Sequence, residues 1–398
     1  MPSAVVFGSC PDDELRVLVE GNKKTKKHVI RRLAGLAGEC VPEEGLDAEN
    51  IRQELLNAHI FTDVEVEVEK EPGVATVKIT VKERWTILPI PNFSTGDNET
   101  GGGLLLMEAN FLGRKKMVMA GAFYSNLSQK YEGLYVDDAF LGSKWIVIAR
   151  PVYSDREFFR YDDEDEIYAY RRKFSMFFLI VGRRLTDTLA PGLGLKYLYT
   201  STESVDDYPE PPSGGHAHSF LLNLRFNNMD YTDYYDRGIN IIAVFEQATP
   251  ALGSERTVSK TGFEFEMVEP LWKVLTRTHL KTGWTWGEDV DILDKYRMGG
   301  EVGARGLVTR GVWLYDFVSF SEEIEERVYR HKYGTLTLVQ FMDFLFSSED
   351  EPFRTYPAIG GGLRAYIKQL AIPAVGVDAG YSLRNYAWHV SAHVGKAF

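Results

Sequence analysis

From Trp85 to the last residue, apolar and polar residues alternate with a period of two in run after run. We count sixteen such runs of roughly eight to fourteen residues, separated by turns, and no convincing amphipathic helix among them. Runs of this length fit tilted strands that cross a bilayer. Because only every second residue of such a strand meets lipid, the mean hydropathy of −0.22 is compatible with a membrane barrel. The sequence therefore predicts a mainly β protein with a 16-stranded antiparallel transmembrane β-barrel over residues 85–398.

The connections between these runs are of two kinds. Those after every second strand are short, as in FLGRK, FLGSK, RRLTD and EPLWK. Several of the others are long and acidic, and we expect loops at 154–172 and 201–218. Short turns at one rim and long loops at the other are typical of outer-membrane barrels. A soluble β-sandwich is the alternative, but it gives no reason for loops on one side.

The last run, NYAWHVSAHVGKAF, supports a barrel with a wet interior. Trp388 and Val390 fall on one face, whereas His389, Ser391 and His393 fall on the other. Apolar side chains outward and small or polar ones inward are what a lipid-facing strand around a wet lumen requires. The terminal aromatic, Phe398, is typical of the signal that bacterial barrel-assembly machinery reads.

Residues 14–84 show a different pattern and form a predicted small domain, preceded by a tail or signal remnant at 1–13. A strand at 14–22 precedes a helix that we expect Thr25 to cap, and Asp47 caps a second helix. Two alternating strands follow, at 63–71 and 74–83, whose facing Glu and Lys side chains would pair. The predicted order is β-α-α-β-β, with one apolar sheet face covered by two helices.

Composition excludes some classes of protein. The net charge of −12 argues against a nucleic-acid partner, because a phosphate-binding surface needs a basic excess. The longest apolar run, residues 176–181, is far short of a membrane-spanning helix. Cys10 and Cys40 are too few for a disulfide framework, and they fit either a pair in an oxidising compartment or free thiols.

The first domain resembles a POTRA domain, the periplasmic module that precedes outer-membrane barrels. The resemblance rests on the Gly21-Asn22 turn, the helix that follows Thr25, and HIFTDVEVEVE at 59–69. Any other small α+β domain is the alternative. Residues 14–398 as a whole resemble the BamA/TamA/FhaC superfamily of outer-membrane insertases and secretion pores. The stretches that carry this are LPIPNFSTG (88–96), GGGLLLMEANFLGRKK (101–116) and GGGLRAYIKQLAIPAVGVDAGY (360–381).

The glycine-rich stretch GGEVGARGLVTRG, residues 299–311, resembles the sixth extracellular loop of that superfamily. This loop folds back into the lumen and carries a Val-Arg-Gly-aromatic tetrad. Arg305 and Gly306 match the tetrad, whereas Ala304 and Leu307 depart from it. The resemblance also implies a partner motif, Phe-x-Asp, which Phe341 and Asp343 supply.

Alternation along TLTLVQFMDF independently places Asp343 on the inward face of its strand. A carboxylate in a partly desolvated lumen needs a cation, and arginine offers a bidentate fork. Asp378, which is also on an inward face, is a second candidate acceptor. We therefore predict that Arg305 locks the loop inside the barrel, with Gly306 allowing a sharp turn beside it.

Other motifs point to structure rather than chemistry. The glycine triplets at 101–103 and 360–362 do not open a helix, so strand packing is favoured over phosphate binding. His216 and His218 lack an evident third metal ligand, and the acidic run 162–166 fits a solvated loop. No Ser-His-Asp, Cys-His or paired-carboxylate arrangement is evident. We expect no catalytic residue, no metal site and no cofactor, and hence no enzyme.

The resemblance implies a protein of the bacterial outer membrane whose POTRA domain lies in the periplasm and whose barrel assists folding and insertion of other outer-membrane proteins. The strand edge with Val64, Val66 and Val68 would capture unfolded client strands. The seam between strands 1 and 16 would template insertion, and Pro89 and Pro91 would weaken it because proline donates no ladder hydrogen bond. Trp388 and Phe398 belong to the same seam. Expected partners are unfolded clients, the bilayer with its lipopolysaccharide, and periplasmic chaperones or accessory lipoproteins. A two-partner secretion pore and a passive structural barrel are the alternative functions.

Overall fold

The computed structural model describes residues 14–37, 46–72, 74–96, 99–162, 165–205, 211–288, 290–300, 303–307, 312–347, 354–371 and 374–394. The chain forms two compact units. Unit 1 runs to Leu88 and also holds Glu108–Lys116 and Lys368–Ala371, and unit 2 holds the rest. Our expectations for the tail at 1–13, Cys10, Cys40 and Phe398 fall outside the described residues.

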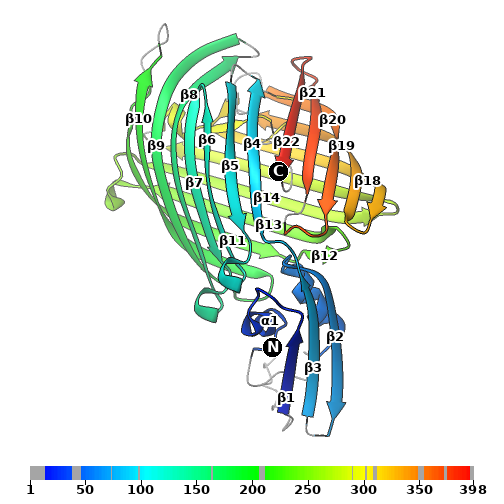
Figure 1. Ribbon diagram of the computed structural model, residues 1–398. Helices are drawn as coiled ribbons and strands as arrows, with labels where there is room; N and C mark the ends of the chain where they lie inside the picture. Colours follow the sequence, from blue (N-terminus) through cyan, green and yellow to red (C-terminus); the bar gives the residue numbers. More distant parts are fainter. Residues whose placement is uncertain are drawn as a thin grey trace, which may run out of the picture. The chain divides into compact units, whose positions relative to one another are not determined.

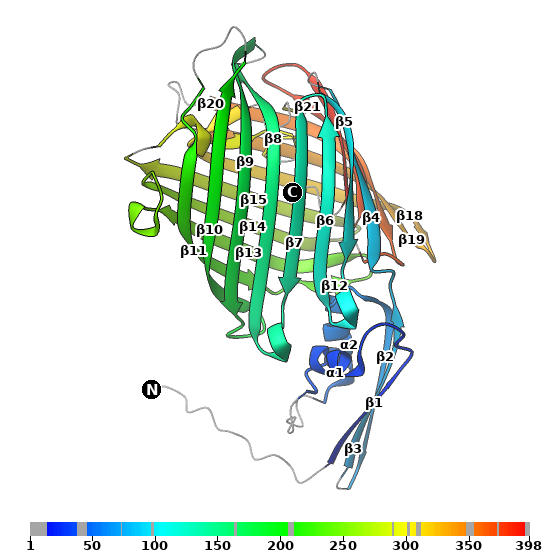
Figure 2. The same ribbon diagram turned by 60° about the vertical axis from the view of Figure 1, so that its left-hand side comes forward.

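Unit 1 contains a three-stranded sheet and two helices, in the predicted order β-α-α-β-β (Figure 2). In the sheet, β3 lies between β1, which is parallel to it, and β2, which is antiparallel. Buried side chains of both helices and of the sheet, among them Ile30, Leu55 and Ile79, form the core. Among the described residues, no helix is long and apolar enough to span a membrane. The bounds are Glu14–Glu20 (β1), Lys27–Leu33 (α1), Ala48–Asn57 (α2), Phe61–Glu71 (β2) and Val74–Glu83 (β3).

One predicted helix cap is confirmed and the other is wrong. Asp47 accepts a hydrogen bond from the Glu49 backbone N–H and caps α2. Thr25, however, lies outside α1, whose N-cap is Lys26, without a side-chain cap. The Thr25 hydroxyl instead accepts a hydrogen bond from Asn110 Nδ2 at 2.8 Å, and its N–H donates to Glu83 at 2.7 Å. A tertiary partner thus displaces the local cap that the sequence suggested.

Unit 2 is a closed antiparallel barrel of sixteen strands, with the three-residue β12 beside β13. The last strand, β22, neighbours the first, β4, so red and cyan strands lie side by side in Figure 1. The strands are Ile87–Gly96 (β4), Glu99–Glu108 (β5), Lys116–Ser125 (β6), Ser128–Asp137 (β7), Trp145–Asp162 (β8), Asp165–Arg183 (β9), Leu189–Ser204 (β10), Gly215–Asn227 (β11), Asp230–Thr232 (β12), Tyr235–Ala248 (β13), Val258–Leu271 (β14), Val274–Gly287 (β15), Asp316–His331 (β18), Gly334–Ser347 (β19), Arg354–Ile367 (β20), Val375–Ser382 (β21) and Trp388–Val394 (β22).

Side chains alternate between the two faces of the barrel wall as the sequence predicts. Along β19, Leu338 and Met342 are exposed on the outer face, whereas Val339, Phe341 and Asp343 are buried inside. On β10, Leu193 and Leu195 are more than 60% exposed, and Lys196, the next residue, points inward to Glu246. Large apolar side chains are stable in such exposure only where lipid replaces water.

The structure of two segments, residues 154–172 and 320–330, could not be predicted correctly from the sequence pattern. Residues 154–172, expected as a loop, belong largely to β8 and β9, whose polar ends continue the alternation beyond the apolar belt. The segment 320–330 would place glutamates toward lipid in either register. Glu323 and Glu325 lie buried inside the barrel, whereas Glu322 and Glu326 fall on the opposite face. A bulge between Arg327 and Tyr329 shifts the register only after these glutamates.

Candidate functional site

The site begins with the loop that follows β15. A short hairpin of β16 (Tyr296–Met298) and β17 (Val312–Leu314) forms its stem. Ala304 and Leu307 are buried in an apolar cluster with Leu314, Phe317 and Leu345, so the loop segment packs against the barrel strands from within. Leu307 thus occupies a packed position although it is not aromatic. Between these two apolar anchors, Arg305 is only 4% exposed.

Arg305 is held by Asp343 through three hydrogen bonds, as the sequence predicted. Its backbone N–H and Nε donate to Asp343 Oδ2 at 3.0 and 2.9 Å, and Nη2 donates to Oδ1 at 2.7 Å. Nη2 also donates to the Ser321 hydroxyl, which itself donates to Asp343 Oδ1 at 2.7 Å. Bidentate, charge-assisted hydrogen bonds of this type fix direction as well as position. Asp343 therefore sets the path of the loop backbone and of the side chain together.

Two further carboxylates complete the surroundings of the guanidinium. Nη1 donates to Asp378 Oδ2 at 3.2 Å and makes a short hydrogen bond to Glu323 Oε1. Asp343, Glu323 and Asp378 lie on β19, β18 and β21, so a single arginine ties the loop to three strands of one wall. Asp378 is the more weakly engaged acceptor, because its Oδ1 has no hydrogen-bond partner in the described part of the chain.

Phe341 and two glycines shape the space for the loop. The Arg305 guanidinium carbon lies 3.4 Å from the centroid of the Phe341 ring, a cation–π contact. A Cβ on Gly380 would meet the Arg305 carbonyl carbon at 2.7 Å, and one on Gly306 would meet the Ser382 nitrogen at 2.7 Å. The loop therefore approaches β21 so closely that only glycine fits at both positions. Gly306 thus serves close approach rather than a sharp turn, since its φ is not in the left-handed region.

A second layer of buried charges lies beside the lock, and the sequence reasoning missed it. Arg364 on β20 donates two hydrogen bonds to Glu323, of 2.7 and 2.6 Å. Arg277 on β15 lies 3.5 Å from Glu323 and 3.7 Å from Glu325, and Tyr366 donates to Glu325 at 3.0 Å. The acidic segment 320–330 was the signal for this layer, because glutamates that face the barrel interior require cationic partners there.

The predicted seam residues lie on the two strands that close the barrel. Pro89 and Pro91 are exposed on β4, and Trp388 is 66% exposed on β22, against Tyr381 of β21. β21 spans eight residues, whereas β9, on the far side of the barrel, spans nineteen. Short strands form few ladder hydrogen bonds, so the wall beside the seam has fewer bonds to break.

The predicted client edge lies on β2 of unit 1. β2 is an edge strand, since its only neighbour within the described sheet is β3. Val64 is buried, and Val66 and Val68 are half-buried on the same face. The alternating glutamates face the other way, and Glu67 lies 3.6 Å from Lys78 across the hairpin as expected.

The other motifs named from the sequence lie away from the lock. The His216 ring packs against Tyr199 and shares a hydrogen bond with the Tyr197 hydroxyl. The His218 ring forms a hydrogen bond with the Gly253 carbonyl oxygen. In the described part of the chain, no group of three potential ligands could hold a metal. The glycines at 360–362 lie within β20, where Gly360 makes room for the Phe341 ring.

Comparison with protein families identifies the barrel. Residues 110–344, more than half of the chain, match the Omp85 superfamily domain. The chain belongs to the Omp85 superfamily. Members of this superfamily are outer-membrane proteins, and the sixteen-stranded barrel with its lumen-inserted loop belongs with them. A search of curated protein sequences gave no match.

Three solved Omp85-type structures share the fold. CdiB from Escherichia coli is 16% identical, with a TM-score of 0.67 over 96% of this chain and 75% of that one. CdiB from Acinetobacter baumannii gives 11% identity and a TM-score of 0.62 over 96% and 73%. BamA from Haemophilus ducreyi lacking POTRA domains 1–3 gives 15% identity and a TM-score of 0.57 over 96% and 83%. At these identities the likeness establishes the fold and no more.

Proposed function

We propose that this Omp85 protein assists the folding and insertion of other outer-membrane proteins. Client strands would pair at its seam between β4 and β22, without an enzymatic step or a cofactor. The observation that carries the proposal is the contrast at the seam. The buried Arg305 network fastens the loop to β18, β19 and β21, whereas on β22, one strand further, the buried His393 forms no hydrogen bond with any described residue. The lock thus fixes the geometry of the barrel wall as far as β21, the neighbour of the strand that would have to part.

The first strand contributes to the same weakness. Pro89 and Pro91 lie within β4, and each removes one backbone donor from the ladder. An opened β4 edge would offer unpaired backbone groups to a client strand, which could then pair by β-augmentation. Because strand exchange replaces hydrogen bonds one for one, such a mechanism needs no nucleotide and no metal.

Unit 1 would act as a POTRA-like capture module in the periplasm. The free edge of β2 offers backbone groups for an extended client segment, and the half-buried Val66 and Val68 supply apolar surface beside it, whereas Val64 is buried and supports the strand from the core. Clients would be unfolded outer-membrane proteins, delivered by periplasmic chaperones or accessory lipoproteins. The bilayer and its lipopolysaccharide complete the surroundings.

Folding into liposomes tests the proposal. The purified full chain is placed in liposomes, an unfolded outer-membrane barrel is added, and its folding is followed by heat-modifiable gel mobility. Empty liposomes and liposomes that hold an unrelated barrel of similar size are the controls. We expect faster folding only with this protein. Equal rates in all three would contradict the proposal, and planar-bilayer conductance would then separate a secretion pore from a passive barrel.

A further inference from the structure

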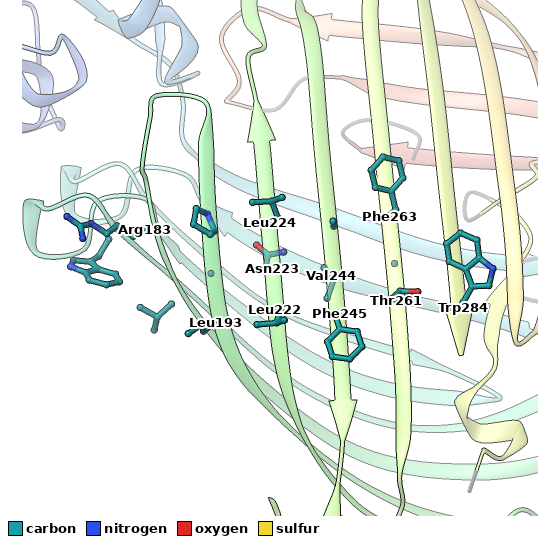
Figure 3. A pocket seen from close by; sticks show the side chains of 16 residues that line it. Arg183, Leu193, Leu222, Asn223, Leu224, Val244, Phe245, Thr261, Phe263 and Trp284 are labelled. Carbon is teal, nitrogen blue, oxygen red and sulfur yellow. The ribbon is translucent and has the colours of Figure 1, made fainter. Parts of the chain in front are cut away.

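We propose that the outer wall of the barrel, opposite the seam, holds one anionic glycerophospholipid in an oblique groove, with its phosphate at Arg183. The groove encloses about 670 Å³ on the outside of β8–β11 and β13–β15 (Figure 3). This site is independent of the proposed function, because none of its residues belongs to the loop lock or to the seam.

The groove follows one line of strand register. Gly182, Gly192, Asn223, Val244, Gly262 and Gly283 are opposed in turn across six neighbouring strands. Because barrel strands tilt by about 35–45°, a line across them climbs through the membrane. It begins one residue before the end of β9 and reaches β15 four residues before the end of that strand. Since β9 runs toward one rim and β15 toward the other, the groove crosses the apolar belt from rim to rim.

Its lining suits an acyl chain. The outward side chains are apolar, with Leu193, Leu222 and Leu224 along the sides and the small Ala243 between them. Aromatic rings of Trp145, Phe245, Phe263 and Trp284 border it. A concave strip gives a flexible chain more van der Waals contacts than the flat wall beside it. The tryptophans at its two ends lie where membrane interfaces favour them.

A cluster of cations marks only one end of the groove. The Arg183 guanidinium lies 5.7 Å from the centre of the Trp145 ring and points outward. The neighbouring Arg184 donates its backbone N–H to the Lys144 carbonyl oxygen at 2.9 Å, so three residues with cationic side chains are backbone neighbours at this rim. In the described part of the chain no carboxylate forms an ion pair with them, and Asp187 of the same turn is exposed.

The charge of this cluster selects the occupant. Short turns lie at the periplasmic rim of outer-membrane barrels, and the turn after Arg183 is of that kind. A phosphate there would gain charge-assisted hydrogen bonds from a guanidinium already oriented by Trp145. A second copy of this chain would bring a second set of the same cations to that rim, which like charge disfavours. In an anionic phospholipid, the headgroup meets the cations at Arg183 and an acyl chain fills the apolar groove.

Native mass spectrometry of the full chain in an uncharged maltoside detergent tests this inference. The probes are phosphatidylglycerol and phosphatidylcholine with identical chains, in equal amounts. We expect wild type to retain one phosphatidylglycerol in preference, and Arg183→Gln to retain it about tenfold less. The matched control is Arg237→Gln, a rim cation outside the groove that pairs with Glu269, and it should behave as wild type. Equal retention by Arg183→Gln would overturn the inference, as would dimers in place of lipid adducts.

The acyl-chain part of the site has its own test. Ala243→Phe fills the groove from the outer face and should abolish retention of both lipids in a barrel that stays heat-modifiable. Independently of that variant, phosphatidylglycerol with brominated chains should quench tryptophan fluorescence in wild type. Trp284→Phe should remove a large share of the quenching, whereas Trp272→Phe, at a fully exposed turn, should leave it intact. Quenching that Trp284→Phe does not change would contradict a lipid chain in the groove.

Discussion

The two sides of the barrel wall are built differently. We define the seam wall as β4–β7, β21 and β22, and its strands β4–β7 and β21 have eight to ten residues. The far wall, β8–β11 and β13–β15, has strands of thirteen to nineteen residues. At about 3.3 Å per residue, β21 is roughly 26 Å long before any tilt, and β9 is roughly 63 Å. The apolar belt of such barrels is about 25 Å tall. The far wall therefore exceeds the membrane, and the seam wall barely crosses it.

The loop lock lies at the border between these regions. Arg305 is anchored on β18, β19 and β21, and Arg364 and Arg277 extend the buried charges to β20 and β15. Buried charges confer geometry rather than net stability, because desolvation opposes their attraction. This fold therefore concentrates specific, directional contacts next to its weakest strands.

Removal of Arg305 should have the largest effect. Arg305→Ala leaves Asp343 and Glu323 buried with fewer cations, and we expect a loss of about 3–5 kcal/mol in stability. Client folding in liposomes should fall at least about tenfold, because the loop no longer braces β21. The readouts are the temperature at which gel mobility changes and the client folding rate. Arg330→Ala, an exposed cation paired with Asp233, is the matched control. An Arg305→Ala protein as stable and active as this control would show that the lock is dispensable.

Loss of Asp343 should destabilise the protein more than loss of Asp378. Asp343→Asn removes the charge that receives three hydrogen bonds from Arg305, and we expect a loss of about 3 kcal/mol. Asp378→Asn removes one bond of 3.2 Å and should cost about 1 kcal/mol. Both are measured by the same gel-mobility transition. The reverse order would mean that the loop is held chiefly to β21 rather than to β19.

Hydrogen exchange should separate the two walls without any substitution. Amides of β21 and β22 should exchange at least about tenfold faster than those of β14 and β15, because shorter ladders open locally at lower free energy. Mass spectrometry of the full chain in bilayer nanodiscs, after peptic digestion, gives both regions in one experiment. Uniform protection around the barrel would remove the physical basis of the contrast.

The smallest effect concerns unit 1 and pH. Burial alone would raise the pKa of Glu83, but hydrogen bonds from the Thr25 side chain and from the backbone of Lys24 and Thr25 hold that pKa below its usual value. A carboxyl group with a lowered pKa contributes stability that is present above its unfolded pKa and is lost as the pH falls through the folded value. Below the ordinary pKa of 4.5, the Lys24 and Thr25 amides should therefore lose exchange protection. Glu83→Gln should show the same loss, of about 1 kcal/mol, at neutral pH. Protection that stays unchanged in Glu83→Gln would contradict this role.

The sequence predicted the barrel and the first shell of the lock because both depend on period-two alternation. Strand faces place Asp343 inward, and a buried carboxylate requires a cation such as Arg305. The link from Glu323 to Arg364 escaped prediction because β19 lies between their strands, and because glutamates fall on both faces of β18. Thr25 was misassigned for a similar reason, since its partner Glu83 is distant in sequence. Residues 154–172 looked like a loop because strand ends beyond the membrane are polar on both faces.

The most direct test of the central claim is a reversible disulfide across the seam. In a background with Cys10 and Cys40 replaced by serine, one cysteine on β4 and one on β22 are screened for a pair that oxidises. The control pair, Phe263→Cys with Thr282→Cys, joins directly opposed residues of β14 and β15 in the far wall. We predict that oxidation of the seam pair abolishes client folding in liposomes, that reductant restores it, and that the far-wall disulfide has no effect. Full activity with the seam closed would contradict the account.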